Sequence, residues 1–243
     1  MSNFTDYNNI SQTTNNSCGA FAVNACICQL GLTGKKSIKS LDSNNLANGY
    51  TSTAQEVDLN ADSNKTTAAE NTYKVTGNLT IDFQQHTATY YTFNSSQQNA
   101  PSAMCKVAYE FNGQNGKKIN FYYTSAASET FSSINQSANQ GFTDNLFDTE
   151  KSLINGINND IKVTEASDYA VPENSDVHLL LVQHPGGMHW LSVCLKTLDT
   201  CNIYDPASGT VYDVANDKLN KQSSIKLNNT NYTMPGLWVL LSK

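Results

Sequence analysis

The chain has 243 residues, of which 39% are hydrophobic and 15% are charged, and its formal net charge is −6 at pH 7. It contains no Arg and fewer Lys than acidic residues, so it is poorly equipped to bind phosphate, and we expect no nucleic-acid partner. This length supports a sizeable core, and no linker-like change in composition divides it. We therefore expect a single domain over residues 1–243.

The apolar runs and the cysteines indicate the compartment. The longest apolar runs are far shorter than the roughly 20 residues of a membrane span, so we expect a soluble protein without one. The first 17 residues lack the basic and apolar regions of a cleaved secretory signal. Six Cys without paired metal-ligand spacing indicate neither a disulfide framework nor a zinc site. We expect a reducing compartment, no metal and no cofactor.

The N-terminal half is predicted to begin with a buried helix. Residues 20–30, AFAVNACICQL, are apolar on nearly every side, which is typical of a helix inside a domain, and Gly31 ends it. The polar stretch 33–72 has no assignable pattern. Strand-favouring residues, partly in alternation, then predict strands over 75–83 and 87–93.

A hairpin, a helix and a C-terminal sheet are predicted to follow. The runs 106–111 and 117–123 flank the loop NGQNG and predict the two strands of the hairpin. Apolar spacing over 145–157 predicts a helix. Strands of the sheet are predicted at 177–183, 189–196, 201–205 and 236–241. We therefore expect an α+β domain with a helix-bearing N-terminal part and a C-terminal sheet.

Cys18 stands directly before the buried helix and is a candidate nucleophile. Unpaired backbone N–H groups and the helix dipole favour an anion at this end, and the thiolate is the reactive form of cysteine. Ser17 is expected to cap the helix, and Gly19 leaves its first turn uncrowded. The alternative is a small buried thiol without chemistry. That alternative is preferred for the cysteines inside apolar segments, namely Cys26, Cys28, Cys105 and Cys194.

His189 and Asp205 are a candidate base and its orienting carboxylate. His189 follows the turn HPGGM and opens a predicted strand, from which Trp190 points to the opposite face. Asp205 ends the strand that returns through a turn near Leu198. Its carboxylate can accept a hydrogen bond from the imidazole and stabilise the imidazolium. The alternative for Asp205 is an Asx-type turn before Pro206.

Gln12, on the polar loop before Cys18, is a candidate oxyanion donor. Its amide and the backbone N–H of Cys18 can donate to the oxyanion that forms when a thiolate attacks a carbonyl, although a surface Gln is the plain alternative. The remaining histidines lack such a context and are expected to be surface or core residues. They are His86, His178 and His184. Because His and Cys form no ligand cluster on one element, metal-dependent hydrolysis is disfavoured.

Together these residues resemble the papain-like cysteine hydrolase superfamily. The resemblance rests on Gln12, the run SCGAFAVNA, the pair His189-Trp190 and Asp205, in that order. The phrases SCGAF, HWLSV and IYDPASG are also similar to those of ubiquitin-like protein proteases, in which the segments come in the reverse order, whereas Josephin-type deubiquitinases have the order found here. The resemblance implies a papain-like fold, with a central N-terminal helix packed on an antiparallel C-terminal sheet. It also implies catalysis by Cys18, His189 and Asp205, with Gln12 in the oxyanion hole.

The predicted function is hydrolysis of an amide bond in a protein substrate through a thioester, most simply by a thiol protease. The same triad would serve isopeptide cleavage from a ubiquitin-like tail or deamidation of a protein Gln, so these activities stay open. A non-catalytic protein-binding module is the alternative outside enzymes. By analogy, we expect a bacterial virulence effector that acts on a host protein in a reducing cytoplasm. We expect it to be a monomer and to be secreted without a cleaved signal.

Substrate specificity is expected to reside in residues 33–170. The catalytic segments contain no stretch with an evident ability to bind a protein partner. The region 75–123, in contrast, contains the aromatic runs YYTF (90–93) and NFYY (120–123). Aromatic side chains are enriched in protein interfaces. The alternative is that these residues pack the core of a sheet.

Overall fold

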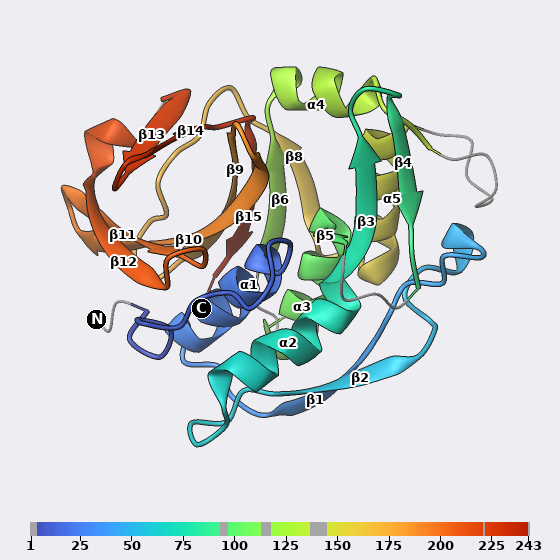
Figure 1. Ribbon diagram of the computed structural model, residues 1–243, viewed down its shortest axis with the longest axis horizontal. Coiled ribbons are helices and arrows are strands. Elements are labelled where there is room, and N and C mark those ends of the chain that lie inside the picture. The colour runs from blue at the N-terminus through green and yellow to red at the C-terminus, as the bar shows by residue number, and fades with distance from the viewer. Residues whose placement is uncertain (1–3, 93–96, 113–117, 137–144, 221, 243) are drawn as a thin grey trace.

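The computed structural model describes residues 4–92, 97–112, 118–136, 145–220 and 222–242. Figure 1 shows α1 between the large sheet on the left and the helices α2 and α3, with a smaller sheet and α5 on the right. The α-helices are α1 (Cys18–Gln29), α2 (Lys65–Thr76), α3 (Pro101–Asn112), α4 (Ser125–Ser132) and α5 (Leu146–Ile157), and short 3-10 turns lie at Leu46–Asn48 and Asn216–Lys218. In the described part of the chain, no helix is long and apolar enough to cross a membrane.

The large sheet carries the segments that were predicted as C-terminal strands. Its order is β12 (Thr210–Ala215), β11 (Thr200–Asp205), β10 (Gly187–Thr197), β9 (Val177–His184), β15 (Leu237–Leu241), β6 (Ile119–Tyr123) and β8 (Lys162–Glu165). A hairpin of β13 (Ser224–Leu227) and β14 (Thr230–Thr233) joins it at β9. Most pairs are antiparallel, but β6 and β8 are parallel. The expected antiparallel sheet is therefore a mixed one.

Two smaller sheets complete the fold. One consists of β5 (Gln98–Asn99), β3 (Gly77–Asp82), β4 (Thr87–Tyr90) and β7 (Asn135–Gln136), in that order. The other is the antiparallel pair β1 (Lys35–Lys39) and β2 (Ala54–Asp58). These strands and α2 lie partly in the stretch 33–72, which could not be assigned from its pattern. The prediction of a strand from residue 75 was early, because Val75 still belongs to α2 and the strand begins at Gly77.

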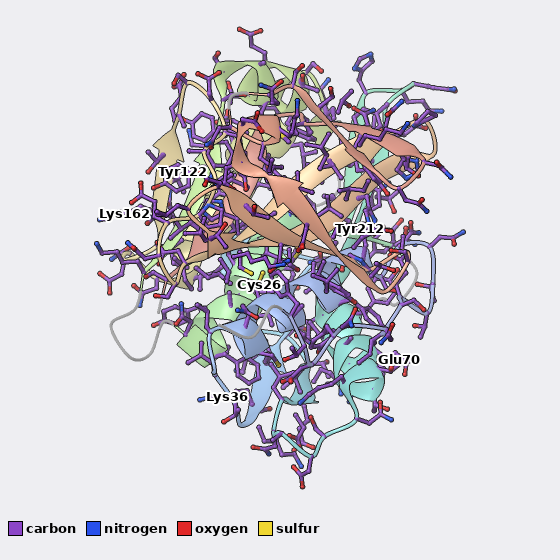
Figure 2. All side chains as sticks on the ribbon, turned by 90° about the vertical axis from the view of Figure 1, so that its left-hand side faces the viewer. Cys26, Lys36, Glu70, Tyr122, Lys162 and Tyr212 are labelled. Atoms are coloured by element: carbon purple, nitrogen blue, oxygen red, sulfur yellow. The ribbon has the colours of Figure 1, made fainter. Side chains whose placement is uncertain are left out.

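The central strand β9 separates two apolar cores. Leu179 and Leu181 belong to the core shared with α1, whereas Leu180 and Val182 belong to the core under the β13–β14 hairpin. Because side chains alternate along a strand, an unbroken apolar run such as LLLV fills both sides of a sheet. Figure 2 places Cys26 of α1 where the helix meets the sheet. The buried helix predicted at 20–30 and the central strands are thus confirmed.

The predicted hairpin over 106–123 was wrong in its first half. Residues 106–111 belong to the helix α3, whose buried side chains follow helical spacing. The apolar ones among them are Ala103, Met104, Cys105, Val107, Ala108 and Phe111. The pattern becomes helical only when residues before 106 are included, and Pro101 at the first helical position fits its start. The second half, β6, is a strand, and the loop 113–117 lies outside the described residues.

An N-terminal segment, residues 4–12, crosses the turn that follows Asp205. Asn9 N–H donates to Gly209 O at 2.7 Å, and Gln12 N–H donates to Pro206 O at 2.7 Å. The hydroxyl of Tyr204 donates to Ile10 O at 2.7 Å. The segment therefore ties the turn to the loop that leads into α1.

Replacing Gly209 by Ala is expected to loosen this attachment. Gly209 has φ +67°, and an added Cβ would lie 2.8 Å from the carbonyl carbon of Ile10 and 2.9 Å from Ser11 N. We expect a loss of about 2–3 kcal/mol in the free energy of unfolding, measured with urea. Gly49→Ala is the matched control, since Gly49 has φ +63° and nothing within 4 Å of the added atom. It should cost about 1 kcal/mol, and equal losses would contradict the packing role of Gly209.

Candidate active site

Cys18 is the first residue of α1 and lies at the wall of a pocket. The residue is 4% exposed. Ser17 occupies the cap position as predicted, but its side chain makes no capping hydrogen bond, because its hydroxyl donates to Thr14 O at 3.0 Å and closes the preceding turn. Gly19 is required by close packing, because a Cβ there would lie 2.5 Å from Cβ of Asn99 and 2.7 Å from the sulfur of Met104. The helix start is therefore held tightly against β5 and α3.

His189 lies between Cys18 and Asp205. Its Nε2–H donates to Oδ1 of Asp205 at 2.7 Å, and both side chains are almost fully buried. Cys18 also lies close enough to act electrostatically on this ring, whose Nδ1 is not used by Asp205. The structure thus brings together the three predicted residues, one from α1, one from β10 and one from the end of β11.

The charges around His189 favour its protonated form. Burial alone would lower the pKa of the imidazole, but the charge of a Cys18 thiolate and the hydrogen bonds with Asp205 and Cys18 outweigh burial and raise it to about 10. The ring is then an imidazolium at neutral pH, which is the form that can stabilise a negative charge beside it. A thiolate–imidazolium pair is the reactive state of a thiol nucleophile.

Asp205 combines the two roles that were considered as alternatives. Its Oδ1 accepts from Ala207 N–H at 2.9 Å, which makes the expected Asx-type turn, and the same atom accepts from His189. Its Oδ2 accepts from the hydroxyl of Ser208 at 3.0 Å. Burial raises the pKa of this carboxyl, but the hydrogen bond and charge of His189 and the two turn donors outweigh burial, so the pKa is lowered overall. The turn therefore fixes the carboxylate that orients the imidazole.

Gln12 lies in the loop before α1, but its amide is engaged locally. Its Nε2 donates to Thr14 O at 2.8 Å. Among the described residues, its buried Oε1 has no hydrogen-bond partner. Its backbone N–H binds Pro206 O, so Gln12 is held next to the turn of Asp205. A role of Gln12 in an oxyanion hole remains a prediction.

A mainly apolar pocket, partly open to solvent, adjoins Cys18. Its walls come from elements that are far apart in the sequence. The apolar lining includes Leu79, Ile81, Phe121, Phe131, Leu146, Phe147, Leu181, Met188, Trp190 and Leu237. Leu79, Ile81 and Phe121 belong to the region 75–123, in which specificity was predicted. The pocket therefore offers a place for an apolar group beside the thiol.

The aromatic runs in that region divide between the core and the pocket. Tyr90 is 1% exposed and donates to Oε1 of the buried Glu150 at 2.6 Å. Phe121 lines the pocket, while Tyr122 stacks on Trp238 in the other core. Phe93 lies outside the described residues. Core packing is thus the correct reading for Tyr90, and Phe121 has the position expected of a specificity residue.

The other histidines and cysteines have the surroundings expected from the sequence, with one addition. His178 is buried, and burial lowers its pKa to about 3. His86 is exposed. Burial raises the pKa of Cys28 to about 11 and that of Cys194 to about 12, in keeping with unreactive thiols. His184 is the addition, since its ring centroid lies 6.5 Å from that of His189.

Tyr232 was not identified from the sequence. Its ring stacks on His189, with centroids 5.9 Å apart and planes 20° apart. It lies on β14, 43 residues after His189 in the chain, and the preceding run LNNTN gives no catalytic signal. The apolar residues Ile225 and Leu227 alternate along the neighbouring strand β13. This alternation could have indicated a hairpin, but not that the hairpin lies over the site.

A thiol next to an imidazole that is hydrogen-bonded to a carboxylate, beside a pocket, defines a thiol-dependent hydrolase. A family model described as Invasion plasmid antigen J, cysteine protease, matches residues 10–243. The chain belongs to this family of cysteine proteases. The match confirms the predicted effector-type cysteine protease of the papain-like class. No curated protein matches the chain significantly.

Proposed function

We propose that this protein is a cysteine protease in which Cys18 is the nucleophile, His189 the general acid and base, and Asp205 the residue that orients His189. The observation that carries the proposal is the hydrogen bond between His189 and Asp205 with Cys18 next to the same imidazole, at the wall of an apolar pocket. The chain order Gln12, Cys18, His189, Asp205 supports a papain-like fold over a single domain, residues 1–243.

The mechanism follows from the charges of the row. The Cys18 thiolate attacks the carbonyl carbon of the scissile amide, and the electron pair of the carbonyl moves onto its oxygen. The backbone N–H of Cys18 and the amide of Gln12 donate to this oxyanion. His189 gives its Nδ1 proton to the departing amine as the C–N bond breaks, which leaves a thioester. Water then attacks the thioester, His189 takes its proton, and the acid product leaves as the thiolate is restored.

The substrate is a protein, as for any protease, and the apolar lining of the pocket supports a substrate with an apolar group next to the scissile bond. The family name, Invasion plasmid antigen J, supports an effector that acts on a host protein. We propose that it acts in a reducing cytoplasm. Deubiquitination and deamidation would use the same three residues, and no feature of the pocket favours either of them. We propose that the enzyme works as a monomer.

Product analysis separates these reactions. Candidate protein substrates are incubated with the wild type and with Cys18→Ala, and the products are analysed by mass spectrometry. Proteolysis gives a new N-terminus and two fragments, isopeptide cleavage releases a tail, and deamidation adds about one mass unit to a Gln. We expect a new N-terminus that Cys18→Ala does not produce. A mass increase on a Gln without fragments would contradict the proposal and establish the deamidase.

The pocket predicts a variant that loses substrate binding but keeps the nucleophile intact. Ile81→Trp places a bulky ring in the pocket, and we expect kcat/KM for the cleaved substrate to fall roughly 10–100-fold. The rate of Cys18 alkylation by iodoacetamide should not change, because the thiolate is generated by His189 on another element.

Phe83→Trp is the matched control. Phe83 follows the same strand, is 42% exposed and does not line the pocket. Its replacement should leave both kcat/KM and alkylation unchanged. If Ile81→Trp leaves kcat/KM unchanged, or lowers alkylation and the melting temperature with it, the pocket is not the substrate site.

A further inference from the structure

An aromatic residue from a separate hairpin covers the ring of His189. Tyr232 of β14 lies against it with the stacked geometry given above, and Tyr232 is 4% exposed. The edge of the His184 ring packs against the same tyrosine, with centroids 5.6 Å apart and planes 86° apart. The imidazole that contacts Cys18 and Asp205 therefore has one face closed by Tyr232.

The position of Tyr232 is coupled to the strand that carries His189. Tyr232 pairs with Ile225 inside the β13–β14 hairpin, and the next residue, Thr233, pairs with Gln183 of β9. Gln183 in turn pairs with Met188 of β10, the neighbour of His189. A continuous ladder of strands thus sets the distance between the two rings.

We infer that Tyr232 is a positioning residue of this site, whose ring keeps water from the hydrogen bond between His189 and Asp205 and holds the imidazole toward Cys18. The inference rests on the proposed function. A hydrogen bond between charged groups is stronger when water is excluded, and an imidazolium is attracted to the face of an aromatic ring. A flat ring also limits rotation of the imidazole about its χ2 angle.

The groups around His189 show which of them contact its ring nitrogens and which only pack against the ring. Asp205 faces it from β11, Cys18 from α1, and His184 approaches it from the end of β9. Burial and the charge of Asp205 raise the pKa of Tyr232 to about 12. Its hydroxyl therefore stays neutral at physiological pH, and its contribution comes from the ring. Tyr232→Phe should retain that contribution, whereas Tyr232→Ala should not.

The titration of His189 tests the inference without a substrate. In protein labelled with ¹³C-histidine, the ring signal of His189 is followed against pH and assigned with His189→Ala. We expect a midpoint far above 6.5 in the wild type and in Tyr232→Phe, and a midpoint lower by about one pH unit in Tyr232→Ala. Alkylation of Cys18 by iodoacetamide at pH 6 should be about tenfold slower in Tyr232→Ala only.

Tyr122→Ala is the matched control. Tyr122 of β6 stacks on Trp238 with centroids 5.3 Å apart and planes 10° apart, so it loses an equivalent stack in the same core. Tyr122→Ala should leave the midpoint of His189 unchanged. An equal shift in this control, or no shift in Tyr232→Ala, overturns the inference.

Two further variants, Tyr232→Leu and Cys18→Ala, distinguish failure of the role of Tyr232 from misfolding and from failure of the proposed function. If Tyr232→Ala does not fold, Tyr232→Leu keeps bulk without a flat face and should show the same lower midpoint, while a wild-type midpoint in it overturns the inference. Cys18→Ala should also lower the midpoint, because it removes the thiolate. If it does not, the thiolate–imidazolium pair and the proposed function fail. If Cys18→Ala lowers the midpoint and Tyr232→Ala does not, only the role of Tyr232 fails.

Discussion

Cys18→Ala and His189→Ala are each expected to lower turnover by roughly 10⁴-fold or more, and the double variant should be no worse than either. The reason is that the thiolate and the imidazolium act as one unit: without His189 the leaving amine receives no proton, and without Cys18 no thioester forms. The measurement is the rate of product formation from the cleaved substrate, followed by mass spectrometry.

Matched replacements distinguish this effect from general damage. Cys28→Ala removes a half-buried thiol from the same helix, and His86→Ala removes an exposed imidazole. Both variants should retain turnover within about twofold of the wild type. Turnover above one tenth of the wild type in either Cys18→Ala or His189→Ala would remove that residue from the mechanism.

The parts of the site that could be predicted are those with local signals. Cys18 is followed by an apolar helix, and this helix had to be buried because it has no polar face. His189 and Asp205 lie at the start and end of two strands joined by a short turn, so the hairpin alone brings them to the same edge of a sheet. In the paired register Ser192 lies opposite Tyr204, so His189 and Asp205 both lie just beyond the last pair, close enough for their side chains to meet.

The parts that could not be predicted depend on contacts between distant segments. Tyr232 reaches His189 only because β14 pairs with β9, and the pocket forms only when β3, β6, α5 and β15 meet. Ser17 has the residue type of a cap, but its hydroxyl binds Thr14 instead. In α3, residues 106–111 taken alone have strand-favouring side chains. The segment is a helix because Ala103 and Met104, which precede this window, are buried in the tertiary structure.

Asp205 is expected to have the next largest effect, and its replacements by Ala and by Asn should differ. Asp205→Ala removes the acceptor of His189, Ala207 and Ser208 together, and we expect kcat to fall roughly 10²–10³-fold. Asp205→Asn keeps Oδ1 for His189 and Ala207, and its Nδ2 can donate to the hydroxyl of Ser208. It therefore removes the charge but not the geometry, and we expect about a tenfold loss.

The pH dependence of stability separates the charge from the hydrogen bonds. The pKa of Asp205 is lowered in the folded protein, so its stabilisation is present above about pH 4 and is lost as the pH falls through the lower folded value. The pKa of His189 is raised to about 10, so its stabilisation is complete below about pH 6.5 and is lost as the pH rises toward 10.

The charged pair should therefore stabilise the fold most between about pH 4 and 6.5. In urea titrations, Asp205→Asn should be less stable than the wild type by about 1–3 kcal/mol at pH 5.5 and should approach it at pH 10. Ser208→Ala is the control, because it removes one neutral donor and leaves both charges, so its deficit should be under about 1.5 kcal/mol and should vary less with pH. If the deficit of Asp205→Asn is the same at pH 5.5 and pH 10, Asp205 acts through the geometry of its turn, because a charge interaction with His189 must vanish when the imidazolium loses its proton.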